Sequence, residues 1–121
     1  MEKLTKAEEP VMQLLWKLKQ AFVKEIIAAM PEPKTPYNTV SSIVRILEEK
    51  EMVGHETFGK THRYYPAVSK IEYRKRLFQS VVQDYFDGSY KALVSHLVED
   101  QSLTKEEVDE LRSIIDNPDQ L

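Results

Sequence analysis

Two β-prone runs separated by a glycine turn follow directly on three short helical segments, and this order limits the fold more than any other feature. The runs are Met52–Phe58 and Thr61–Pro66, with Gly59-Lys60 between them, a pattern that predicts a β-hairpin. Three short amphipathic helices followed by a hairpin is the element order of a winged helix-turn-helix. We therefore expect a mainly α fold with a small β-hairpin wing, and a winged-helix DNA-binding domain over residues 1–66.

Capping and proline signals delimit the three helical segments. A capping-box pattern of Thr5 and Glu8 starts the first, because each side chain can satisfy a free backbone amide of the first turn. The second covers about nine residues and stops at Pro31, and the third follows Thr35 as candidate N-cap with Pro36 at the first helical position. Helical spacing predicts that the first and third segments bury these residues: Ala7, Val11, Leu14, Leu15, Leu18, Val40, Ile43, Val44 and Leu47.

The outward face of the third segment carries short or forked hydrogen-bonding groups. In a helix-turn-helix the second helix of the pair enters the major groove, where Ser, Thr, Asn and Arg can bind base edges. The candidate base-contacting residues are Asn38, Thr39, Ser41, Ser42 and Arg45. A merely solvated helix face is the alternative interpretation.

The hairpin tip supplies candidates for phosphate contacts, which position a protein on DNA without reading its sequence. These candidates are Lys60, His62 and Arg63. A solubilising turn is the alternative interpretation of the same residues. Tyr64 and Tyr65 alternate across the second strand, so one of them is expected in the core.

Net charge permits DNA binding without arguing for it. The chain of 121 residues has a net charge of −3. Residues 1–66 hold 10 Lys and Arg against 9 Asp and Glu, a net of +1, whereas residues 67–121 hold 7 against 11, a net of −4. The acidity therefore lies in the C-terminal half, away from the expected groove-facing helix.

The chain has few residues of the types that form catalytic or metal sites. The absence of cysteine excludes disulfides, thiolate metal sites and cysteine nucleophiles. His55 and His62 could approach each other across the hairpin near Glu56, but two ligands on a hairpin without a fixed third make poor metal chemistry. We expect no enzyme, no metal and no cofactor.

The hydropathy of the sequence predicts a cytoplasmic protein. No apolar run approaches the ~18 residues of a membrane span, and the first ten residues carry acids where a signal peptide would be apolar. We expect a cytoplasmic protein without membrane insertion.

Residues 67–121 return to helical periodicity and form three amphipathic helices. The last begins at a second capping box of Thr104 and Glu107. Helices of this apolarity need a partner surface, which a second copy of the chain or the winged unit could provide. We favour a homodimer, and the expected dimerisation residues are Leu77, Val81, Tyr85, Leu93, Leu97, Leu111 and Ile115.

Short motifs along essentially the whole chain match one known family. They are Leu4-Thr5-x-Ala7-Glu8, Val11-Met12-x-Leu14-Leu15-Trp16, Tyr37-x-Thr39-Val40, Leu47-Glu48-Glu49-Lys50, Gly59-Lys60 with Tyr64-x-Pro66, and Leu103-Thr104-x-Glu106-Glu107. Through them the chain resembles the penicillinase repressor family of BlaI, MecI and CopY. The resemblance implies a winged-helix N-terminal domain, a three-helix C-terminal dimerisation domain, and repression of transcription by a homodimer on palindromic operator DNA. Recognition-helix contacts of the family fall on Thr39, Ser41, Ser42 and Arg45.

The resemblance also implies how repression is relieved. Copper-responsive members use a C-terminal cysteine cluster, which this chain lacks. In β-lactam-responsive members a membrane sensor protease triggers cleavage at an Asn-Phe bond in the dimerisation domain, and the matching positions here are His96 and Leu97. Because a leucine at position 97 also fits the buried face of an amphipathic helix, the residues themselves favour a structural role. The alternative function is a winged-helix module that binds protein rather than DNA.

Overall fold

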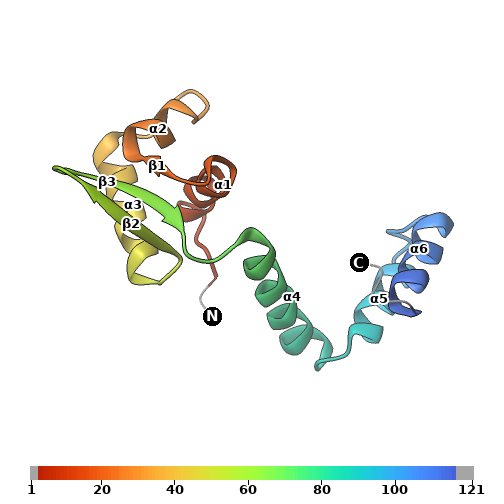
Figure 1. The fold of residues 1–121 in the computed structure, drawn as a ribbon. Coiled ribbons are helices and arrows are strands. Elements are labelled where there is room, and N and C mark those ends of the chain that lie inside the picture. Colours follow the sequence, from red (N-terminus) through yellow and green to blue (C-terminus); the bar gives the residue numbers. More distant parts are fainter. Residues whose placement is uncertain (1–2, 117–121) are drawn as a thin grey trace. The chain divides into compact units, whose positions relative to one another are not determined.

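The computed structural model describes residues 3–116, except for the side chains at positions 111, 112, 114, 115 and 116. The chain divides into two compact units, residues 1–77 and 78–121. Its elements (Figure 1) are α1 (Glu8–Leu18), β1 (Ala21–Phe22), α2 (Val23–Ala28), α3 (Tyr37–Glu49), β2 (Val53–Phe58), β3 (Thr61–Pro66), α4 (Lys70–Phe86), α5 (Tyr90–Glu99) and α6 (Lys105–Asp116). The predicted fold class, mainly α with a small β wing, is confirmed.

A three-stranded antiparallel sheet forms the wing side of the first unit, in the order β1-β3-β2. The predicted hairpin forms, with its first strand beginning at Val53 rather than Met52, and Gly59 supplies the positive φ of 60° that its turn requires. The sequence reading missed β1, whose two residues pair with Tyr64 and Arg63 of β3. This short strand leads directly into α2 and so ties the helix-turn-helix to the wing.

The start of α1 confirms the first capping box and corrects the predicted buried face. The Thr5 amide donates to the Glu8 carboxylate at 2.8 Å, and the Glu8 amide donates to the Thr5 hydroxyl at 3.2 Å. Ala7 and Leu18 were expected to be buried but are exposed. Glu8 takes the inward position instead, at 3% exposure, where its carboxylate accepts a 2.9 Å bond from Lys50 beyond the end of α3.

The helix α3 begins one residue later than predicted. Pro36, not Thr35, is its N-cap, with φ −59° and ψ 149°, and its carbonyl accepts the first amides of the helix. The loop before it is closed by Lys34, whose ammonium donates to three carbonyls at the end of α2 at 2.8–3.2 Å. Because Val40, Val44 and Leu47 are fully buried, this face of α3 packs against α1 and β2. The opposite face of the helix is left exposed.

The first turns of α4 belong to the winged unit. Trp16 donates its indole N–H to the Val68 carbonyl at 2.9 Å, and its ring lies 5.6 Å from that of Tyr73. Tyr73 is 5% exposed, and its hydroxyl accepts the buried Leu4 amide at 3.1 Å. The compact unit therefore continues past the hairpin to Leu77, which packs against its core.

The second unit contains the rest of α4 with α5 and α6. Ser89 caps α5 by accepting the Ala92 amide at 3.1 Å, and the second predicted capping box is confirmed by reciprocal 3.1 Å bonds between Thr104 and Glu107. Among the described residues, no helix is long and apolar enough to cross a bilayer.

Candidate nucleic-acid interface

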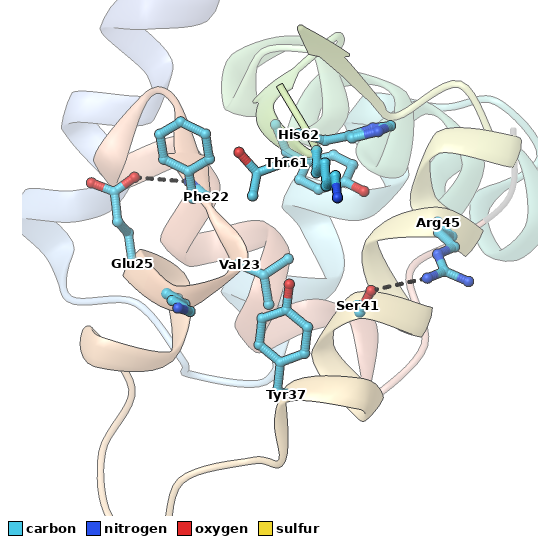
Figure 2. Close-up of a pocket in the computed structure, with 11 residues that line it drawn as sticks. Phe22, Val23, Glu25, Tyr37, Ser41, Arg45, Thr61 and His62 are labelled. Atoms are coloured by element: carbon cyan, nitrogen blue, oxygen red, sulfur yellow. Dashed lines mark hydrogen bonds between the residues drawn. The ribbon is translucent and has the colours of Figure 1, made fainter. Parts of the chain in front are cut away.

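The outer face of α3 presents the polar residues that the sequence singles out. Asn38, Thr39, Ser42 and Arg45 are exposed, and Ser41 is half-buried. The Ser42 hydroxyl donates to the Asn38 carbonyl at 2.9 Å, so its oxygen can still accept a hydrogen bond. Arg45 donates a long 3.4 Å bond to the Ser41 hydroxyl (Figure 2). This contact holds the guanidinium near the α3 surface, and no acidic side chain of the described residues pairs with it.

The hairpin divides the predicted wing cations between its two faces. Successive strand residues point to opposite sides, so His62 lies on the same face as Tyr64 and the core, whereas Arg63 lies on the other. Lys60 and His62 line one cavity with Ser41 and Arg45 of α3. The structure thus brings two of the three wing candidates together with the helix.

Arg63 makes a separate cluster on the outer face of the sheet. Its guanidinium carbon lies 4.6 Å from the centre of the Phe58 ring, and Nη2 lies 3.6 Å from the Glu56 carboxylate. Its Nε is buried and has no hydrogen-bond partner among the described residues. Arg63 therefore packs against Phe58 and Glu56 and does not line the cavity that Lys60 and His62 line.

The two hairpin histidines do approach each other, with ring centres 4.1 Å apart. The carboxylate beside them is Glu48 of α3, which contacts His55 Nδ1, and not the neighbouring Glu56, which faces Arg63. Among the side chains that the structure describes, no group of three or more His, Asp or Glu is arranged to hold a metal ion. His55 therefore links the hairpin to α3 through Glu48, and His62 packs against the His55 ring.

A cavity of about 680 Å³ separates the start of α2, the outer face of α3 and the hairpin (Figure 2). Tyr64 forms part of its lining and is 6% exposed. Burial raises the pKa of the Tyr64 phenol above its ordinary value, and the Glu48 carboxylate adds to the effect. The hydroxyl therefore remains protonated, as a hydrogen-bond donor, at neutral pH. Sequence reasoning missed this cavity because Phe22 reaches it through β1, which has no periodic signal.

Comparison with known proteins identifies the family. The sequence profile of the penicillinase repressor family matches residues 4–117. This chain belongs to the penicillinase repressor family. It is 25% identical to the methicillin resistance regulatory protein MecI of Staphylococcus aureus strain N315, over 93% of this chain and 92% of that protein. It is also 25% identical to MecI of Mammaliicoccus sciuri over the same shares, and 24% identical to the penicillinase repressor of Bacillus licheniformis over 93% and 89%.

In this member of the penicillinase repressor family, the bond that matches the regulatory cleavage position lies inside α5. His96 is exposed with its ring 5.8 Å from that of Phe86, and Leu97 is half-buried. The carbonyls of both residues accept backbone amides at the end of the helix, at 3.0 and 3.3 Å. A protease would need to unwind the last turns of α5 to reach this bond.

The predicted dimerisation residues have different environments. Leu77 packs against the winged core, Leu93 and Leu97 are half-buried, and Val81 and Tyr85 are 36% and 79% exposed. The side chains of Leu111 and Ile115 lie outside the part of the chain that the structure describes.

Proposed function

We propose that this protein represses transcription by binding operator DNA, with α3 in the major groove and the hairpin beside it. One observation carries the proposal: Ser41 and Arg45 of α3 line a common surface with Lys60 and His62 of the hairpin. In helix-turn-helix proteins a groove-entering helix reads base edges, and flanking cations bind phosphates. Membership of the penicillinase repressor family supports the same function.

Removal of Arg45 tests the base contact. The parent protein first selects a binding sequence from a random duplex library, and Kd values are then measured for the selected duplex and a scrambled one. Arg45→Ala should weaken specific binding by about 1–3 kcal/mol and reduce discrimination at the contacted base. Arg76→Ala is the matched control, because the same charge is lost from α4, where Arg76 pairs with Glu72.

Removal of Lys60 separates phosphate contacts from base contacts. Lys60→Ala should weaken binding to both duplexes equally and reduce the slope of log K against log salt by about 1. If the parent selects no sequence at low salt while it remains folded, the protein-binding module becomes the better interpretation. Equal effects of Arg45→Ala and Arg76→Ala would contradict the proposed role of α3.

We also propose that the repressor is a homodimer that binds a palindromic operator through its second unit. Phe78, Val81 and Tyr85 are spaced to share one face of α4, and they are 51%, 36% and 79% exposed. An apolar stripe of this kind is typical of a helix that packs against another subunit. Two identical winged units would then bind two symmetric half-sites.

A paired substitution on the full chain tests the interface. The double variant Phe78→Glu with Tyr85→Glu should sediment as a monomer at micromolar concentration, because it places charge in the apolar contact. The double variant Gln79→Glu with Gln83→Glu introduces the same two charges at exposed positions on another side of the same helix and should remain dimeric. A Phe78→Glu and Tyr85→Glu double variant that still sediments as a dimer would place the interface elsewhere.

Relief of repression by a membrane sensor protease is the remaining part of the proposal. The names of the relatives, which refer to methicillin resistance and penicillinase, support a response to β-lactams. Mass spectrometry of the protein recovered from β-lactam-treated cells should detect a fragment ending at His96. If the repressed gene is induced while the chain remains intact, induction does not use this cleavage.

A further inference from the structure

We propose that the cavity between α2, α3 and the hairpin binds a small planar organic carboxylate, and that this ligand competes with DNA. The effect on DNA rests on the function proposed above, whereas binding of the ligand does not. The cavity volume of about 680 Å³ falls within the range of small-molecule sites in proteins. Its lining combines aromatic rings with a few polar groups, as such sites do.

The floor of the cavity contains an unused hydrogen-bond donor. The Tyr64 residue lines the cavity and is 6% exposed, and its hydroxyl forms no hydrogen bond with another described residue but remains accessible to solvent. Tyr37 lines the same cavity, and Figure 2 shows its hydroxyl beside Val23. The phenol groups of Tyr37 and Tyr64 both line the cavity. They can donate hydrogen bonds, which favours a ligand with acceptor oxygens.

The electrostatics of the rim favour an anion. Lys24, Arg45 and Lys60 surround the opening, and none of them forms an ion pair within the described part of the chain. The acidic side chain in the lining, Glu25, is engaged by the Phe22 amide at 2.8 Å. Cations gathered around a partly enclosed space raise the local concentration of anions.

The walls favour a flat ligand rather than the DNA backbone. The Tyr37 side chain lines the cavity, and an aromatic face packs well against another planar ring. Phe22 is also a lining residue, but its ring packs edge-on against Phe58. A duplex backbone can reach the exposed rim cations, but its convex surface does not fill a space whose floor holds the Tyr64 hydroxyl. Because Ser41, Arg45 and Lys60 also belong to the proposed DNA surface, the ligand and the operator exclude each other.

The first experiment measures ligand binding by the full chain without DNA. The probe is 4-hydroxybenzoate, followed by ligand-observed NMR and by calorimetry. We expect saturable binding at ~1 mM or below, and Tyr64→Phe should weaken it about tenfold through loss of one bond to a charged acceptor. Tyr65→Phe is the matched control, because it removes the same hydroxyl from the adjacent residue on the opposite face of the strand and should leave binding unchanged.

Two further measurements test the charge and the competition. The uncharged analogue 4-hydroxybenzamide should bind at least tenfold more weakly than the carboxylate. Saturating 4-hydroxybenzoate should raise the operator Kd of the parent severalfold, and Tyr64→Phe should need about ten times more ligand for the same effect.

Several results would overturn the proposal. These are no saturable binding of 4-hydroxybenzoate, equal losses from the two tyrosine variants, equal affinity for the amide, or an operator Kd that the bound ligand leaves unchanged. Failure of the DNA function is distinguishable, because a parent that binds the carboxylate but selects no duplex refutes operator binding and leaves the ligand site standing.

Discussion

The ion pair between Glu8 and Lys50 should hold the end of α3 to the start of α1, and Lys50→Met tests this role. One oxygen of the Glu8 carboxylate accepts the Thr5 amide at 2.8 Å and the Lys50 ammonium at 2.9 Å. Glu8 is 3% exposed, and the Lys50 side chain is 22% exposed. Methionine keeps most of the lysine stem but leaves the buried carboxylate without its cation.

The expected cost follows from burial. Removing one partner of a fully buried pair costs about 3–5 kcal/mol, and a single hydrogen bond to a charged group contributes about 1.5–3 kcal/mol. Because water still reaches Lys50, and the Thr5 bond remains, we expect Lys50→Met to lower the free energy of unfolding by about 2 kcal/mol at pH 7. Lys17→Met removes a charge from an exposed position on α1 and should change it by less than about 0.5 kcal/mol.

The effect should depend on pH in a defined direction. Burial alone would raise the pKa of Glu8, but the Thr5 and Lys50 contacts outweigh it and hold the pKa below its ordinary value of 4.5. A depressed folded pKa stabilises the protein above that ordinary value, and the contribution is lost as pH falls through the folded pKa. Without Lys50, the pKa of Glu8 is no longer lowered by the ammonium, so the difference between parent and variant should shrink as the pH falls through the folded pKa of Glu8 in the parent.

Urea unfolding at several pH values provides the measurement. Trp16 is the single tryptophan and lies beside Tyr73 inside the winged unit, so its fluorescence reports that unit rather than the second one. A loss that is the same at pH 3 and pH 7 would show that the destabilisation is not electrostatic. A loss no larger than that of Lys17→Met would refute the assigned role of the pair.

Three other substitutions test local features of the winged unit by the same fluorescence assay. Tyr73→Phe leaves the buried Leu4 amide without its acceptor and should cost about 1–3 kcal/mol; no loss would mean that another acceptor replaces the hydroxyl. Gly54→Ala places a methyl group 2.6 Å from the Tyr65 hydroxyl and should displace that ring at a cost of about 1 kcal/mol, unless the exposed ring moves freely. Gly59→Ala meets no atom within 4 Å but forces alanine to φ +60°, so about 1–2 kcal/mol of backbone strain is expected, and an unchanged stability would mean that the turn relaxes.

Local signals were sufficient for most helices and for the hairpin. Both capping boxes form as predicted, because Thr and Glu three residues apart satisfy the same two amides wherever a helix begins. The hairpin follows from two β-prone runs around Gly59. These features depend on neighbours within a few residues, so they can be read without knowledge of the tertiary structure.

Features that depend on tertiary contacts were not predictable in the same way. Glu8 was expected only to cap a helix, but the capping turn also directs its carboxylate inward, where Lys50 arrives from 42 positions away. The strand β1 exists because β3 lies beside it, since two residues have no periodicity of their own. The cavity depends on that pairing, because Phe22 enters its lining from β1.

The position of Arg63 depends on which of two neighbouring tyrosines enters the core, and this choice affects the functional interpretation. Tyr64 and Tyr65 are equally suited to the core by composition, and the choice between them decides which wing residues share the α3 side. Because Tyr64 is buried, His62 faces α3 and Arg63 is placed over Phe58 on the far face. The proposed DNA surface is therefore less basic than the sequence of the hairpin suggests. With fewer phosphate contacts per winged unit, affinity depends more strongly on two linked units binding together, so loss of the dimer should weaken operator binding more than loss of any one wing cation.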